Sequence, residues 1–346
     1  FELGAGVSAR AIFMDSCATD VRIAQNHIEC SGDAIRAAFQ QPFPNFFGSQ
    51  FAVAHNFLVV PNGRALHLDG DIYAAVVFNS MRAKYGVELD ASNDLYAING
   101  KTGTVAGNIF EVASGPALEL ATQDEEDKNV FEDNCYVPTP GQSHLVAQTQ
   151  SGQTWLFNDW RTAERERYSL QKPVAFVAPD DLHLAAPDDD LNGRAAHFAL
   201  YINEFRDIDN DSLPPSWPDI GADQFDAPVT NADLRNAAGS QRRQPCGEAF
   251  PVRFVPKNTG EKVIENARIT WTLNSQPRPD FVWQGALDPD ASDTMTLAEL
   301  PFAADSQYIV EAAIQLIDGK PDLYDGFNKA SFALYSDLSG NEVTVG

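Results

Sequence analysis

Residues 76–81 read VVFNSM and place one asparagine between two short apolar runs. Related stretches recur along the first half of the chain, among them IAQNHI at residues 23–28 and VAHNFL at residues 53–58. The asparagines of the six related stretches are Asn26, Asn56, Asn79, Asn108, Asn134 and Asn158, at spacings of 30, 23, 29, 26 and 24 residues. Self-similarity at periods of this size is typical of a solenoid built from stacked repeats.

A glycine follows most of these asparagines and opens a second short apolar run. These glycines are Gly32, Gly63, Gly86, Gly115 and Gly141. Two β-like runs per period predict a right-handed parallel β-helix over roughly residues 1–170. In such a fold the asparagines stack on successive coils, and their amides hydrogen-bond to one another as an internal ladder. Ordinary turn asparagines in the left-handed conformation are the alternative interpretation.

The composition limits the class of protein. The chain has 346 residues, of which 44% are hydrophobic, so it is long enough and apolar enough for two or more packed domains. No run of 18 apolar residues is present, and we therefore expect no membrane span. The net charge of −25 comes from 24 basic and 49 acidic residues and excludes nucleic-acid binding, because the phosphates would be repelled. A soluble extracellular protein is expected.

The four cysteines show no metal-binding spacing. Cys17 and Cys30 flank one asparagine of the series, so a disulfide between them and two buried thiols are both open. Phe1 lies close to the first recognisable coil, with no polar cap before it, and solenoids need caps. We therefore expect the chain to be a piece of a longer protein.

The repeat ends between residues 171 and 226 in three short acidic stretches. These are DLHL at residues 181–184, DIDND at residues 207–211 and DIGADQF at residues 219–225. They resemble the end of the solenoid in secreted bacterial proteins with right-handed parallel β-helix repeats, although Gln224 stands where that family usually has glutamate. The resemblance implies the fold and a secreted protein, and it assigns no chemistry.

Short alternating strands separated by turn signals follow, and this pattern predicts a β-sandwich. Between about residues 245 and 335 the chain resembles the immunoglobulin-like, cell-adhesion-related domains of secreted bacterial proteins. The residues that carry this resemblance are Cys246, Asn258, Thr259, Gly260, Trp271, Trp283, Gly285, Asp290, Asp322 and Asn328. The sequence thus predicts an all-β chain with a β-helix at 1–226 and an immunoglobulin-like β-sandwich at 227–346. Together the two resemblances imply a type IX secretion exoprotein.

The runs that follow the glycines predict one outward-facing column of side chains on a sheet. Its members are Phe13, Arg36, His67, Asp90, Glu119 and Val146. Two carboxylates in a groove can serve as acid and base for glycoside hydrolysis, and His67 or Arg36 can abstract a proton in a lyase. A solvated column of alternating charge that stabilises stacked strands is the alternative.

Calcium is the one metal ion that the sequence suggests, at two acidic places. Asp207, Asp209 and Asp211 alternate as in oxygen-rich calcium loops, but no EF-hand pattern follows them. The second place contains Asp318, Asp322, Asp325 and Asn328. A plain acidic turn is the alternative interpretation of each stretch.

Two short Asp-Ser/Thr patterns match sites of bacterial O-glycosylation. They contain Ser212 and Thr294, both in turn-like segments where a glycan would not disturb a core.

Two function classes remain. The favoured hypothesis is a non-enzymatic extracellular, cell-surface or filament-forming module of adhesion or assembly, with other surface proteins, copies of itself or glycans as partners. The alternative is a polysaccharide lyase or glycoside hydrolase whose site is the column of Arg36, His67, Asp90 and Glu119. The chain lacks the sequence motifs of polygalacturonases and the clustered basic residues that hold polyuronates.

Overall fold

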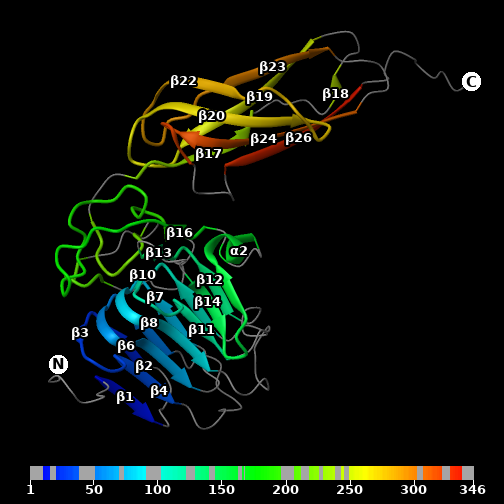
Figure 1. Cartoon of the computed structure of the whole chain (residues 1–346). Coiled ribbons are helices and arrows are strands. Elements are labelled where there is room, and N and C mark those ends of the chain that lie inside the picture. The colour runs from blue at the N-terminus through cyan, green and yellow to red at the C-terminus, as the bar shows by residue number, and fades with distance from the viewer. Residues whose placement is uncertain are drawn as a thin grey trace, which may run out of the picture. The chain divides into compact units, whose positions relative to one another are not determined.

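The computed structural model shows an all-β chain that divides into two compact units, Phe1–Ala227 and Pro228–Gly346 (Figure 1). The described residues are 11–15, 21–38, 51–69, 74–90, 103–121, 129–139, 145–162, 166, 168–195, 206–211, 218–225, 229–237, 243–244, 249–301, 307–321 and 328–336. No helix among these residues is both long and apolar enough to cross a membrane.

The first unit contains sixteen strands and one short helix in its described part. They are β1 (Ile12–Asp15), β2 (Val21–Ala24), β3 (His27–Glu29), β4 (Ile35–Ala38), β5 (Phe51–Ala54), β6 (Phe57–Asp69), β7 (Ala74–Val77), β8 (Ser80–Asp90), β9 (Gly103–Ala106), β10 (Ile109–Val112), β11 (Leu118–Leu120), β12 (Asn129–Glu132), β13 (Cys135–Val137), β14 (Leu145–Thr149), β15 (Thr154–Leu156), α2 (Phe157–Thr162) and β16 (Leu170–Gln171).

Two sheets of mainly parallel strands form this unit. The smaller sheet has the order β12-β9-β7-β5-β2, in which each strand pairs in parallel with the strand one repeat away. The larger sheet follows the path β1-β4-β6-β8-β10-β13-β16, with β3 on β6 and β11 between β8 and β14. The β14–β15 pair is antiparallel, and the other pairs between strands β1 to β16 in the described part of this unit are parallel.

The repeat period places equivalent apolar side chains above one another. In the smaller sheet the parallel register aligns Ile23, Val53, Val76, Val105 and Phe131, and all five are buried. Each such side chain stabilises the fold by about 1.5–3 kcal/mol on burial. These columns form the main hydrophobic core of the unit.

The recurring glycines allow a close approach between successive repeats. A β-carbon on Gly63 would lie 2.0 Å from the carbonyl oxygen of Gly32, and one on Gly86 would lie 2.1 Å from the carbonyl oxygen of Ala117. No side chain fits at such distances, so these positions require glycine for space.

A left-handed residue precedes each of five repeat asparagines. These residues are Gln25, His55, Phe78, Gly107 and Asp133, with φ between 52° and 64°. The backbone therefore turns sharply at the same place in each of these repeats, between a strand of the smaller sheet and a strand of the larger one. Four of the five residues are not glycine, so the turn is strained and must be held by its surroundings.

The second unit contains only strands in its described part. They are β17 (Ala232–Asn236), β18 (Arg243–Gln244), β19 (Ala249–Asn258), β20 (Ile264–Leu273), β21 (Gln276–Pro277), β22 (Phe281–Leu287), β23 (Met295–Pro301), β24 (Gln307–Ile317), β25 (Lys320–Pro321) and β26 (Lys329–Ser336).

Two sheets again form this unit, and here the pairing is almost entirely antiparallel. One sheet has the order β17-β19-β23, and the other has the order β18-β26-β24-β20-β21 with β22 and β25 at its sides. Buried and exposed residues alternate along β19 and β20, as expected for strands with one face on a core. Phe254, Ile269 and Trp271 belong to that core, which is separate from the core of the first unit.

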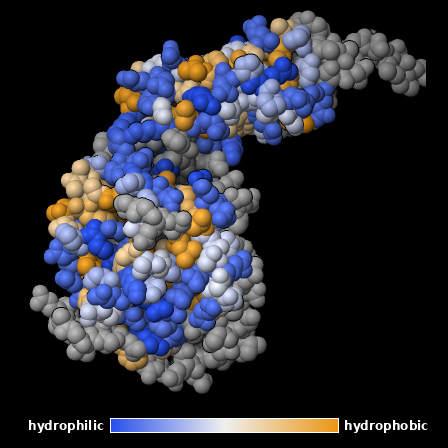
Figure 2. Space-filling view, viewed as in Figure 1, coloured by the Kyte–Doolittle hydropathy of each residue, from blue (hydrophilic) through white to orange (hydrophobic). Residues whose placement is uncertain are grey.

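On the face drawn in Figure 2, hydrophilic residues predominate and smaller hydrophobic groups lie between them. This distribution agrees with the acidic composition of the chain.

Candidate functional site

The side chains of five repeat asparagines form one hydrogen-bonded column. The Nδ2 atoms of Asn26, Asn56, Asn79 and Asn108 each donate to the Oδ1 of the next asparagine, over 2.9–3.1 Å, and the series ends at Asn134. The backbone N–H of each of these four donors also donates to the same Oδ1. The column thus satisfies polar groups that would otherwise be costly to bury.

Asn158 is not part of this column, contrary to the sequence prediction. It lies exposed in α2, one residue after the helix begins. The next position after Asn134 is taken by Glu166 and Ser169, because Nδ2 of Asn134 donates to Glu166 Oε1 and its backbone N–H donates to Ser169 Oγ. Complete burial raises the pKa of Glu166 to about 7, although hydrogen bonds from Tyr136 and Asn134 partly offset the rise.

The charged column on the larger sheet differs from the sequence prediction by two residues. The parallel register aligns Arg36 with His67, His67 with Glu88, and Glu88 with Glu119. Asp90 aligns with Asp69 instead, so Glu88 replaces it in the column. Farther along, Glu119 aligns with Gln148 and not with Val146, which is buried. No residue marks the register after Gly86, because β8 continues through this glycine without a break.

Ion pairs connect the charged side chains of the larger sheet, which we call the charged face: Arg36, Arg64, His67, Asp69, Glu88 and Glu119. Asp69 connects one half of this face. Asp69 lies 2.7 Å from an Nη2 of Arg36 and 2.6 Å from Nε2 of His67. The side chains of these three residues are 14–27% exposed, so water reaches all of them. Contacts of this kind between neighbouring strands stabilise a sheet by a few tenths of a kcal/mol to about 1 kcal/mol each.

Arg64 connects the other half of the face. Its guanidinium lies 2.7 Å from Glu88 and 3.0 Å from Glu119. His67 lies 3.4 Å from the same Glu88 oxygen, so Glu88 is shared by two partners. The two carboxylates that could act as acid and base are therefore both bound by one guanidinium.

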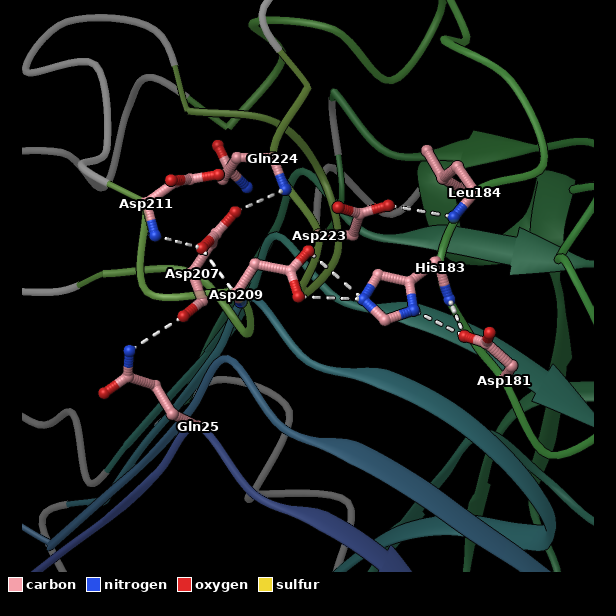
Figure 3. Close-up of polar contacts among 9 residues, drawn as sticks. All are labelled: Gln25, Asp181, His183, Leu184, Asp207, Asp209, Asp211, Asp223 and Gln224. Atoms are coloured by element: carbon pink, nitrogen blue, oxygen red, sulfur yellow. Dashed lines mark hydrogen bonds and ion pairs between the residues drawn. The ribbon is translucent and has the colours of Figure 1, made fainter.

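A second cluster of titratable side chains lies in the segment after the repeats, where three separate stretches meet (Figure 3). His183 Nδ1 contacts Asp181 Oδ1 at 2.5 Å, and His183 Nε2 lies 3.2 Å from Asp209 Oδ2. The nearest ligand atoms of His183, Asp209 and Asp223 all lie within 4.8 Å of one another. Asp223 uses Oδ2 to accept the backbone N–H of Leu184, which fixes its carboxylate beside the imidazole.

The electrostatics of this cluster follow from its contacts. Burial lowers the pKa of His183, but hydrogen bonds to Asp181 and Asp209 outweigh that effect and leave the pKa raised. Burial raises the pKa of Asp223, whereas the hydrogen bond from His183 lowers the pKa of Asp181. The imidazole of His183 contacts Asp181 through Nδ1 and Asp209 through Nε2, so one ring connects two of these carboxylates.

The predicted calcium loop has a different local structure. The carboxylate of Asp207 is buried and accepts the backbone N–H groups of Asp209, Asp211 and Gln224, so it fixes a turn. Asp209 points to His183, and in the described part of the chain the converging set is His183, Asp209 and Asp223, not the three alternating aspartates. This turn geometry could not be read from the alternating pattern alone.

The remaining predicted residues are found at separate places. At the second predicted calcium place, Asp318 Oδ1 accepts the backbone N–H groups of Glu265 and Asn266, while Asp322 and Asp325 lie outside the described residues. Asn328 is buried there. Thr294 is exposed directly before β23, Ser212 and Cys17 lie outside the described residues, and Cys30 is buried.

Comparisons with known proteins give weak structural likenesses, of which two are described here. No family model matches the chain, and no curated protein matches it. A solution NMR structure of the CARDB domain of a Pyrococcus furiosus protein is 14% identical, with a TM-score of 0.27, and covers 32% of this chain and 96% of its own. A crystal structure of that domain in complex with di-metal ions is 13% identical, with a TM-score of 0.26, and covers 33% and 96%. Values this low assign neither a fold nor a function to the chain.

Two residues of the second cluster were missed as site residues in the sequence. His183 and Asp223 belong to the stretches that resemble a solenoid end, and they were interpreted only as part of that end. The sequence shows only that the stretches 181–184, 207–211 and 219–225 are all acidic. They do not recur at a regular spacing, so nothing indicates that they meet in the fold.

Proposed function

We propose that the chain is a non-enzymatic structural module of a secreted or cell-surface protein that acts in adhesion or filament assembly. In this proposal the first unit is a right-handed parallel β-helix and the second is an immunoglobulin-like β-sandwich. Parallel pairing at the repeat period and the asparagine column support the first assignment. Two antiparallel sheets around one core support the second.

The ion pairing of the charged face carries this proposal. Arg64 contacts both Glu88 and Glu119, and Asp69 contacts both Arg36 and His67. These carboxylates already contact cationic partners within the face, whereas the acid and base of glycoside hydrolysis must contact the substrate. The ion pairs of this face therefore serve best to stabilise the pairing of neighbouring strands.

The partners belong to the same proposal. Other surface proteins, copies of the chain and glycans all suit a stiff, acidic scaffold that presents a large stacked surface. An extracellular location and type IX export are part of the proposal too, and they rest on the sequence resemblance alone.

A carbohydrate-active enzyme is the second candidate, because one observation favours it. His67, Glu88 and Glu119 lie on adjacent strands at one level, so an imidazole and two carboxylates line up across the sheet. The site in this version contains Glu88 in place of Asp90.

The test measures degradation and association on the same protein. Neutral and acidic polysaccharides incubated with the chain are expected to release no reducing ends and no unsaturated products. Sedimentation and pull-down with the same polysaccharides, and with the chain itself, are expected to show binding or self-association. Degradation that disappears in both Glu88→Gln and Glu119→Gln, while the conservative variant Asp211→Asn keeps it, would establish the enzyme instead.

A further inference from the structure

The cluster around His183 has the arrangement of a metal site whose histidine is already oriented. Nδ1 of the ring contacts Asp181, so Nε2 faces Asp209 and Asp223 (Figure 3). A metal-binding histidine commonly has this second contact, because a carboxylate on one ring nitrogen fixes the ring and leaves the other for the ion.

The carboxylates are also held in place by groups outside the cluster. Buried Asp207 accepts the backbone N–H of Asp209 at 3.0 Å, so the turn that carries Asp209 is fixed. The backbone carbonyl of Asp207 accepts a hydrogen bond from Nε2 of Gln25, the residue directly before Asn26. Asp223 is held by the backbone N–H of Leu184 at 2.9 Å.

We propose that His183, Asp209 and Asp223 bind a divalent first-row transition metal ion, for which zinc is the best probe. One imidazole nitrogen and two carboxylate oxygens form a ligand set that zinc takes in proteins, whereas calcium prefers six to eight oxygens. Two ligand atoms on one zinc ion lie roughly 3.0–3.4 Å apart. The 3.2 Å between His183 Nε2 and Asp209 Oδ2 already meets this condition.

The charge at this place favours the ion further. Asp181, Asp209 and Asp223 bring three carboxylates to one imidazole. A divalent ion offsets repulsion among them more strongly than a single imidazolium. Because the ligands come from three separate stretches of the first unit, the bound ion would cross-link these stretches. This structural role is independent of the proposed function.

Zinc titration of the complete chain tests the proposal. The protein is first treated with a chelator, and zinc binding is then measured by competition with a chromophoric chelator and by the shift in melting temperature. Zinc is expected to bind one strong site and to raise the melting temperature, since it binds the folded state. Calcium at the same concentration is expected to give a much smaller shift.

Matched aspartate variants identify the ligands. Asp223→Asn and His183→Gln are expected to weaken zinc binding at least tenfold, whereas Asp211→Asn is expected to leave it unchanged. Asp211 lies in the same turn as Asp209, but its exposed carboxylate is outside the converging set. Circular dichroism checks that each variant is folded, and cobalt absorption spectra report the ligand geometry directly if a variant is destabilised.

Three outcomes overturn the proposal. The first is zinc affinity that is unchanged in both Asp223→Asn and His183→Gln. The second is an equal loss in Asp211→Asn, which would return the site to the three alternating aspartates. The third is stronger stabilisation by calcium than by zinc.

Discussion

Glu166 stands at the position where the column of asparagines ends. The amide of Asn134 needs an acceptor there, and a carboxylate offers two oxygens and no donor. The same oxygen also accepts the hydroxyl of Tyr136. Burial of this carboxyl raises its pKa to about 7, from an ordinary value of 4.5.

Glu166 is expected to make stability fall as the pH rises. Between pH 4.5 and about 7 the folded state keeps a proton that the unfolded state has released, so the free energy of unfolding decreases with increasing pH in this window. The shift corresponds to about 3 kcal/mol. Glu166→Gln resembles the protonated side chain and is expected to lose that part of the decrease.

Urea unfolding at several pH values measures this difference between the two proteins. Burial lowers the pKa of His55 to about 3 and raises the pKa of Asp219 to about 7, and both groups are present in wild type and variant. Their contributions therefore cancel in the comparison. Equal pH dependence of the two proteins would show that Glu166 is ionised in the fold.

Asn79→Ala is expected to destabilise the first unit by about 3 kcal/mol or more. Asn79 is fully buried, its Nδ2 donates to Val53, Val77 and Asn108, and its Oδ1 accepts two bonds from Asn56. Removal of the amide leaves several buried groups unsatisfied, each at about 1–3 kcal/mol.

Chemical unfolding compares this variant with Asn158→Ala. Asn158 has the same residue type but lies exposed in α2, so its replacement is expected to cost well under half as much. Equal effects of the two substitutions would mean that the buried column contributes nothing special.

At the scale of the element, the sequence predicted the asparagine of each repeat turn but not the left-handed residue before it. The asparagine recurs because its amide makes the same bonds in successive repeats, and that recurrence is visible in the sequence. The left-handed residue before it is Gln25, His55, Phe78, Gly107 or Asp133, and these share no residue type. The surrounding strands impose this conformation, so it could not be predicted from the local sequence.

The hairpin between β20 and β21 shows the opposite case, a turn set by local chemistry. Leu273 pairs with Gln276, so Asn274 and Ser275 form a two-residue loop, and their φ values are 51° and 61°. Two positive φ values fit the twist of a hairpin, and asparagine followed by glycine is the preferred pair for such a loop.

Ser275→Gly is expected to raise the stability of the second unit by about 1 kcal/mol. In the left-handed conformation the β-carbon of serine lies too close to the following carbonyl oxygen, and glycine has no β-carbon. Thermal unfolding measures the gain, and Ser275→Ala serves as the control because alanine keeps the β-carbon. A loss of stability on Ser275→Gly would show that the freedom of the unfolded glycine outweighs the relief of strain.

At the scale of the whole molecule, composition and periodicity predicted an all-β chain of two parts with different strand patterns. They did not predict the clusters. The charged face depends on a register across β8 that no residue marks, and Glu88 therefore escaped notice. The His183 cluster depends on turns that bring together residues about 26 and 40 positions apart in the chain.

Salt is expected to stabilise the protein as a whole. The net charge of −25 repels itself, and the Debye length falls from about 30 Å at 0.01 M salt to about 3 Å at 1 M. Exposed ion pairs such as Arg36–Asp69 weaken at the same time, but each contributes little. The melting temperature should therefore rise with added sodium chloride, and a fall would show that paired charges dominate.

The asparagine column has a direction, and this direction bears on how such a protein can change its length. Each interior asparagine receives a bond from one neighbour and passes the same bond to the next. A copied repeat inserted between two existing repeats would find the partners it needs, because both of its neighbours present matching groups. A repeat appended after Glu166 would not, because Glu166 accepts and has no amide to pass on. Lengthening by gene duplication is therefore open in the interior of the column and closed at its end.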